Sequence, residues 1–239
     1  MTLLEVRRLG RTRYAEAHAL QQTLLEQRIA GAVGDLLLLT EHEPVVTVGR
    51  GTPAEEQRVL AATGLEVVEV ERGGEATYHG PGQLVAYPIV ELPPERRDLH
   101  RYLRDLEEVV LGVLAEFELT GARRPGLTGV WLGEKKVCSI GVAVRRWVTW
   151  HGLALNLHTD LAPFRRFHPC GLAPDVMTRL ADHAELAPTN LLGEVLLVKH
   201  FCRVFGHELP PPAPLASPPV SPTDGPPGAG PGFRPLPLF

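Results

Sequence analysis

The spacing of apolar residues in the first third of the chain predicts alternating helices and strands. Residues 14–28 carry apolar side chains at helical spacing with polar residues between them, which is typical of an amphipathic helix. The short apolar runs at 35–40 and 45–49 predict two buried strands joined by a turn, in which we place His42. A short helix is expected over 53–62, because proline is tolerated in the first turn of a helix.

The middle of the chain contains two further strand patterns and the clearest helical one. We expect strands over 65–70 and 84–92, and a helix over 99–119 that ends near Gly121. The predicted core stripe of that helix consists of Leu99, Leu103, Leu106, Val110, Val113 and Phe117.

The pattern after Pro125 changes to consecutive strands. Residues 129–132, 136–145 and 149–157 are separated by short turns and predict a meander packed beside the earlier sheet. A final amphipathic helix is expected over 190–205. We therefore assign residues 1–208 to one domain and residues 209–239, rich in proline and glycine, to an extended or disordered tail.

Composition narrows the classes of function. With 239 residues, the chain is long enough for one substantial core. Its net charge of -4 gives no sign of the basic surface that nucleic-acid binding requires. No stretch approaches the ~18 apolar residues of a membrane span, so we expect no membrane partner. The three cysteines are widely spaced, unlike a zinc site or a disulfide scaffold, which favours a cytoplasmic location.

Residues 72–90, RGGEATYHGPGQLVAYPIV, do not look like core sequence. Glycines let a backbone approach a ligand closely, while Arg72, Tyr78 and His79 add charge, shape and a proton-handling group. A glycine-rich hairpin connection would explain any one of these glycines. The whole string is better explained as a ligand-binding loop held between two strands.

Cys170 is the candidate nucleophile, since it lies between proline and glycine in a predicted loop. Cys138 and Cys202 fall within a predicted strand and helix, where a cysteine usually behaves as a small buried hydrophobe. A thiol with the reference pKa of about 8.5 is only a few per cent thiolate at neutral pH, so a working nucleophile needs a nearby cation or base. Sequence spacing leaves that partner open among Lys136, His79, His151 and His168.

Four motifs together resemble the lipoyl(octanoyl) transferases. They are the 72–90 stretch, KVCSIGVAV with its lysine, HGLALN, and FHPCGL with its cysteine, in that order and within residues 15–205. The resemblance implies a mixed α/β fold with flanking helices, shared with biotin and lipoate protein ligases. It also implies that Cys170 is the acyl-accepting nucleophile and Lys136 its partner. The implied substrate-binding residues are Arg72, Gly73, Gly74, Glu75, Ala76, Thr77, Tyr78, His79, Ser139, Ile140, Gly141, Gly152, Leu153 and Ala154.

By the same resemblance, the expected reaction moves an octanoyl group from acyl carrier protein to a lysine of a lipoyl domain. The expected acceptors are the lipoyl domains of 2-oxoacid dehydrogenase E2 subunits and the glycine cleavage H protein. Thioester exchange followed by amide formation needs neither ATP nor a metal or other cofactor. Two alternatives remain: an ATP-dependent lipoate or biotin ligase, and a non-catalytic module that binds acyl groups or carrier protein.

Overall fold

The computed structural model describes residues 2–186 and 188–211 of the chain. Nearly all of the proposed proline-rich tail therefore lies outside the described residues. Within them, no helix is both long and apolar enough to cross a membrane.

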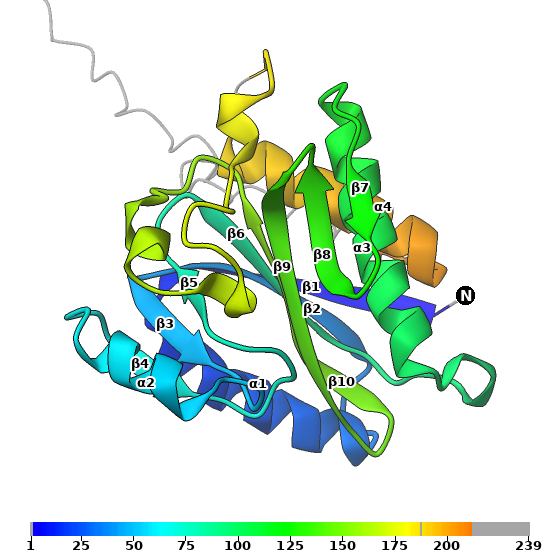
Figure 1. Ribbon diagram of the computed structural model, residues 1–239. Helices are drawn as coiled ribbons and strands as arrows, with labels where there is room; N and C mark the ends of the chain where they lie inside the picture. The colour runs from blue at the N-terminus through cyan, green and yellow to red at the C-terminus, as the bar shows by residue number, and fades with distance from the viewer. Residues whose placement is uncertain (1, 187, 212–239) are drawn as a thin grey trace, which may run out of the picture.

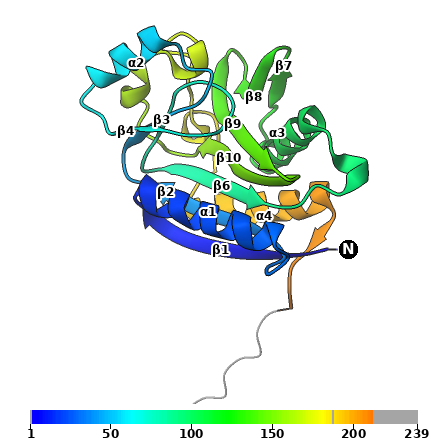
Figure 2. The ribbon, with the colours of Figure 1, turned by 90° about the horizontal axis from the view of Figure 1, so that it is seen from below.

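A mixed eight-stranded sheet forms the centre of the fold, in the order β11-β1-β2-β6-β10-β9-β8-β7 (Figure 1). The pairs of β1 with β2 and with β11 are parallel, whereas the remaining neighbours are antiparallel. The N-terminus and the last described strand consequently lie side by side at one edge (Figure 2). The strands are β1 (Thr2–Thr12), β2 (Asp35–His42), β6 (Gln83–Ile89), β7 (Ala122–Arg124), β8 (Leu127–Leu132), β9 (Lys135–Arg145), β10 (Val148–Asn156) and β11 (His207–Glu208).

A second sheet of three strands lies beside the first (Figure 1). Its central strand is β3 (Val45–Val48), which pairs in parallel with β4 (Val67–Glu69) and antiparallel with β5 (Thr77–His79). The apolar runs that form β2 and β3 are adjacent in sequence, yet they belong to different sheets. The turn between them carries the chain from one sheet to the other.

Helices α1 (Tyr14–Ile29), α3 (Leu99–Glu116) and α4 (Asn190–Phe205) cover the two faces of the large sheet. Helix α2 (Ala54–Ala61) instead packs its Leu60 against Val46 and Val48 of the small sheet. Strand side chains alternate between faces, so Leu37 and Leu39 of β2 join the cluster under α3 and α4, whereas Leu36 and Leu38 join the cluster under α1. This two-sided burial explains the unbroken apolar run in β2.

The predicted fold class, a mixed sheet with flanking helices, is confirmed, while several details are corrected. The strands after residue 125 do not pack beside the earlier sheet, because β10 pairs with β6 and continues it. β1, β5, β7 and β11 were not predicted. β1 is rich in charged residues and mostly exposed, which hides the strand pattern.

Helix α3 begins at Leu99 as predicted, but its C-terminal end and its exposed first residue differ from the prediction. The helix stops at Glu116, and Glu118 takes the left-handed backbone conformation with φ of 58°. Gly121 instead packs tightly against Leu111 and Leu114, where a Cβ atom would collide. Leu99, predicted to be part of the core stripe, is exposed at the start of the helix.

His42 is a buried strand residue, so its assignment to a turn was wrong. Its Nε2 lies 2.7 Å from the hydroxyl of Tyr87 on β6, and its ring meets His79 of β5 at 5.7 Å between centroids. His79 in turn bonds Gln83 and Thr47. Burial lowers the pKa of His42 to about 4 and that of His79 to about 3, so both imidazoles are neutral near pH 7.

These two histidines should make the protein sensitive to acid. In the unfolded chain the two imidazoles take up protons near pH 6.5, whereas in the folded chain His42 does so only near pH 4 and His79 near pH 3. The free energy of unfolding therefore falls as the pH drops from about 6.5 towards 4. The His42 contribution alone amounts to about 2 kcal/mol of unfolding free energy lost between about pH 7.5 and about pH 5.

Urea denaturation at the two pH values checks this. On acidification, the unfolding free energy of His42→Gln should fall by about 2 kcal/mol less than that of the wild type. The unfolding free energy of the exposed control His100→Gln should fall as much as that of the wild type. Equal pH dependence in the wild type and His42→Gln would contradict the assignment.

Candidate functional site

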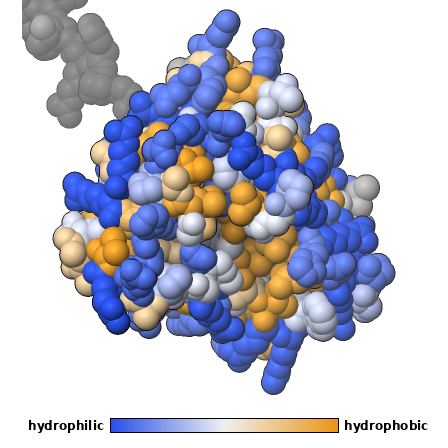
Figure 3. Space-filling view, in the orientation of Figure 1, coloured by the Kyte–Doolittle hydropathy of each residue, from blue (hydrophilic) through white to orange (hydrophobic). Residues whose placement is uncertain are grey.

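A pocket of about 290 Å³ opens where the loop before β5 meets strands β9 and β10. Its walls come from α1, β6, β9, β10, the 72–79 stretch and the loop that carries Cys170. In the space-filling view, hydrophobic residues gather in the middle of the face and hydrophilic residues surround them (Figure 3). The pocket brings together residues from Tyr14 to Leu172, which are far apart in the sequence.

Cys170 lines this pocket from a short 3₁₀ turn, Pro169–Gly171. Its backbone is left-handed, with φ of 55° and ψ of 34°, a conformation that non-glycine residues adopt only when the surroundings enforce it. Its N–H donates to the carbonyl of Ala76 at 2.8 Å, and its Sγ lies 3.9 Å from the Ser139 hydroxyl. The thiol is therefore fixed against both the 72–79 stretch and β9.

Lys136 reaches the same pocket from β9 and is only 3% exposed. After Cys170 the chain returns to β9, where the Lys136 N–H donates to Val176 and the Lys136 carbonyl accepts from Thr178. Among the described residues, no carboxylate forms an ion pair with the Lys136 ammonium, whose Nζ lies 5.8 Å from the centroid of the Trp131 ring. The lysine thus brings a positive charge into the pocket without a carboxylate to neutralise it.

The three histidines that the sequence offered as alternative partners of Cys170 have different environments in the structure. His168 bonds Glu56 through both its ring Nδ1 and its backbone N–H, and it does not line the pocket. His79 does line it, but its low pKa keeps it uncharged at neutral pH. His151 also lines the pocket, with its Nε2 3.8 Å from a Glu71 oxygen. Lys136 is therefore the best-placed cation of the four candidates.

Arg72 organises the loop around the pocket. Its guanidinium donates to the Thr47 carbonyl and hydroxyl and to the carbonyls of Gly73 and Glu75, at 2.8 to 3.1 Å. Burial lowers the pKa of Arg72, an effect that the Coulombic interaction with Cys170 partly opposes. The side chain needs room, which Gly49 supplies because a Cβ atom there would strike the guanidinium.

The expected binding stretch 72–79 faces two ways. Thr77 and His79 of β5 line the pocket, whereas Ala76 and Tyr78 turn to the opposite side and join an apolar cluster with Phe164. This alternation is that of a strand, which the sequence interpretation had taken for a loop. Gly73 also lies off the pocket, beside the groove next to α1.

The other two expected stretches are neighbours in the sheet. On β9 and β10, Ser139 pairs with Ala154, Ile140 with Leu153, and Gly141 with Gly152. All six line the pocket. A Cβ atom at Gly141 would crowd the Arg72 side chain, and one at Gly152 would collide with the Ala86 carbonyl. Sequence motifs that lie thirteen residues apart, Ile140 and Leu153, thus form one continuous wall.

Several pocket residues were missed from the sequence. Val85 and Tyr87 alternate along β6, so the strand pattern was visible, but nothing in it distinguished the pocket face from the core face. Only tertiary packing reveals that distinction. The missed residues are Tyr14, Val85, Tyr87, Gly126, Leu127, Thr128 and Leu172.

The remaining cysteines have environments that suppress their reactivity. Cys138 is fully buried in the main core, and burial raises its pKa to about 12. Burial also raises the pKa of Cys202 on α4. Neither lines the pocket, which agrees with their interpretation as small hydrophobes.

Comparison with known proteins places the chain in a family. Residues 13–201 match the model of the lipoyl protein ligase A/B catalytic domain. The chain is 49% identical to an octanoyltransferase of Syntrophotalea carbinolica, over 87% of this chain and 97% of the relative. It is 43% identical to an octanoyltransferase of Solibacter usitatus, over 89% of this chain and 97% of the relative.

Solved structures with low sequence identity share the fold. A bipartite lipoate protein ligase from Thermoplasma acidophilum is 18% identical, with a TM-score of 0.69 over 88% of this chain and 86% of that one. Biotin protein ligase from Aquifex aeolicus, in complex with biotin and ATP, is 14% identical, with a TM-score of 0.54 over 86% and 71% of the two chains. By the family match and its close relatives, the chain belongs to the lipoyl protein ligase A/B catalytic domain family and, within it, to the octanoyltransferases.

Proposed function

We propose that this acyltransferase moves an octanoyl group from acyl carrier protein to a lysine of a lipoyl domain, by way of a thioester on Cys170. The observation that carries the proposal is the meeting of Cys170 and the buried Lys136 in one pocket. At about 290 Å³, that pocket is at the small end of ligand sites and suits a short acyl chain better than a nucleotide. The close octanoyltransferase relatives support the choice of acyl group.

Two transfers complete the reaction. In the first, the Cys170 thiolate attacks the thioester carbonyl of the donor, the bond to the carrier sulfur breaks, and the carrier leaves as a thiol after taking a proton. In the second, the uncharged amine of the acceptor lysine attacks the Cys170 thioester, an amide forms, and the cysteine leaves as thiolate. The first exchange is nearly neutral in energy, whereas amide formation runs downhill.

Lys136 has two tasks in this scheme. As an ammonium near Cys170 it favours the thiolate, and the buried Arg72 charge acts in the same direction. Lys136 also exchanges the proton of the departing carrier thiol and of the incoming amine. Backbone N–H groups of the glycine-rich loop and of the strand edges stabilise the oxyanion of each tetrahedral intermediate.

The pocket walls hold the acyl chain. Ile140, Leu153 and Ala154 supply apolar surface on the two paired strands, and Val85 adds to it from β6. Each methylene that leaves water contributes about 0.8 kcal/mol, so the pocket favours octanoyl over shorter chains. The expected acceptors remain E2 lipoyl domains and glycine cleavage H protein.

The acyl-enzyme should be visible by intact mass. Mixing octanoyl acyl carrier protein with the enzyme, without ATP, should add one octanoyl group to Cys170 in the wild type and in Cys138→Ala, and none in Cys170→Ala. Absence of the octanoyl adduct in the wild type would contradict the proposal and favour a non-catalytic binding module. Adenylate formed from lipoate, magnesium and ATP would instead indicate a ligase.

Lys136 and its neighbour Lys135 form a matched pair for testing the proposed role of the Lys136 ammonium. Lys135 is partly exposed, pairs with Asp175 and does not line the pocket. Lys136→Met should slow octanoyl transfer by about 10²- to 10⁴-fold, because it removes both the cation and the proton carrier. Lys135→Met should stay within about threefold of the wild type, since a surface ion pair contributes little.

The measurement is the single-turnover rate of octanoyl transfer to a lipoyl domain. Unchanged rates in Lys136→Met, with thermal unfolding showing a folded protein, would remove Lys136 from the mechanism.

A further inference from the structure

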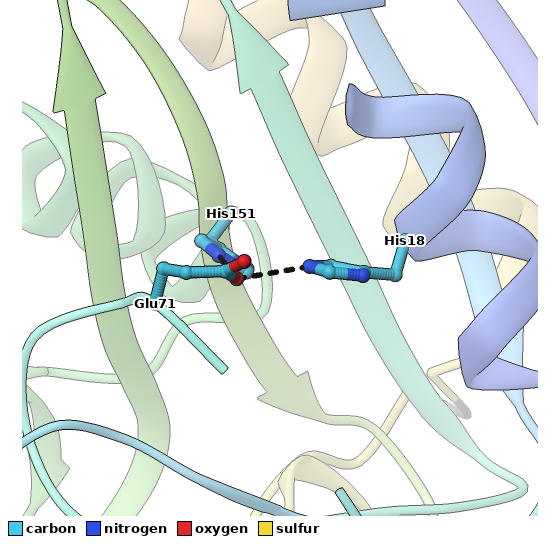
Figure 4. Close-up of side chains that lie close together, drawn as sticks. All are labelled: His18, Glu71 and His151. Carbon is cyan, nitrogen blue, oxygen red and sulfur yellow. Dashed lines mark hydrogen bonds and ion pairs between the residues drawn. The ribbon is translucent and has the colours of Figure 1, made fainter. Parts of the chain in front are cut away.

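A second cluster of ligand-type side chains lies beside the pocket and shares His151 with its lining. His18 of α1, Glu71 from the segment between β4 and β5, and His151 of β10 converge there (Figure 4). One nitrogen of each imidazole and one carboxylate oxygen all lie within 4.8 Å of one another. His18 Nε2 is 3.1 Å, and His151 Nε2 is 3.8 Å, from the same Glu71 oxygen.

His151 gives the observation that points to a ligand. Its side chain is 2% exposed, and its Nε2 is a buried polar atom with no hydrogen-bond partner among the described residues. Leaving such an atom unpaired costs free energy, so an unsatisfied buried nitrogen in a native fold requires an explanation. A metal ion between His151, His18 and Glu71 would satisfy that nitrogen.

The surroundings hold the two rings in place before any ion arrives. The imidazoles of His18 and His151 are stacked at 5.7 Å between centroids, and the Trp150 ring stacks on both. Gln21, one helical turn after His18, accepts a hydrogen bond from the His151 backbone N–H at 3.0 Å. One face of α1 therefore fixes the backbone of one candidate ligand and supplies another.

The donor set selects the class of ion. Two imidazole nitrogens and one carboxylate oxygen suit Zn²⁺ and related transition ions, whereas Mg²⁺ and Ca²⁺ prefer sites made of oxygen. Three protein ligands leave one tetrahedral position for water. Glu71 is the most exposed member, with 41% of its side chain accessible, and it also lines the groove beside α1, so an ion can enter from that side.

We propose that His18, Glu71 and His151 form a binding site for a divalent transition-metal ion, with Zn²⁺ as its best-fitting occupant. The ion links α1, the segment just before Arg72, and β10, each of which contributes to the acyl pocket. Its role is to brace that wall, and it takes no part in bond making. The site needs neither the thiol nor the lysine of the transfer reaction.

Titration calorimetry of the full chain, cleared of metal with a chelator, tests the site. The wild type should bind one Zn²⁺ per chain and show no saturable heat with Mg²⁺. Glu71→Gln and His18→Gln should each weaken Zn²⁺ binding at least about tenfold, whereas the exposed control His100→Gln should match the wild type.

A cysteine thiolate also binds Zn²⁺, so Cys170→Ala is a necessary arm. Retained one-to-one binding in Cys170→Ala, together with its loss in Glu71→Gln, supports the cluster. Absence of binding in the wild type, its loss in Cys170→Ala, or unchanged affinity in both cluster variants would each overturn the proposal. Thermal unfolding of each variant establishes that it is folded, and Zn²⁺ should raise the midpoint for the wild type but not for Glu71→Gln.

Discussion

The site depends on the return of the chain to β9 after Cys170. Two backbone hydrogen bonds tie Lys136 to Val176 and Thr178, and a third ties the Cys170 N–H to Ala76. These bonds place Cys170 and Lys136, 34 residues apart in sequence, in the same pocket, where Cys170 has a strained left-handed conformation. Without them, the loop that carries Cys170 would have no fixed relation to β9.

The role of the glycine-rich 72–90 stretch follows from its position next to Cys170 and β9. Read alone, an arginine among glycines could be a phosphate cradle. In the fold, the Arg72 guanidinium is buried and engaged by Thr47 and by nearby carbonyls, so it shapes the loop from inside. Residues of the stretch form one wall of the pocket, and β9 and β10 form another.

Much of the fold could be predicted because local pattern reflects burial. Helices α1, α3 and α4 and strands β2, β9 and β10 carry apolar spacing that matches their packing. β1 could not be predicted in the same way, since a mostly exposed strand rich in arginine has no alternating pattern. His42 was misplaced because its acidic and proline neighbours suggested a turn, whereas tertiary packing buries it against Tyr87.

Only the parts of the site that lie within recognisable sequence motifs could be predicted. Spacing and family resemblance led to Cys170, Lys136 and three proposed binding stretches, but not to which side of β5 faces the pocket. Nor could they bring together His18, Glu71 and His151, since these come from three separate elements. Such juxtapositions are set by how helices and sheets pack, which leaves no local signal in the sequence.

The central claim is that Lys136 activates Cys170, and alkylation of the thiol tests it most directly. At about pH 7, iodoacetamide should label Cys170 faster in the wild type than in Lys136→Met, while Lys135→Met keeps the wild-type rate, because iodoacetamide reacts with thiolate. Peptide mapping by mass spectrometry assigns the label to Cys170. Equal labelling rates in the wild type and a folded Lys136→Met would contradict the account.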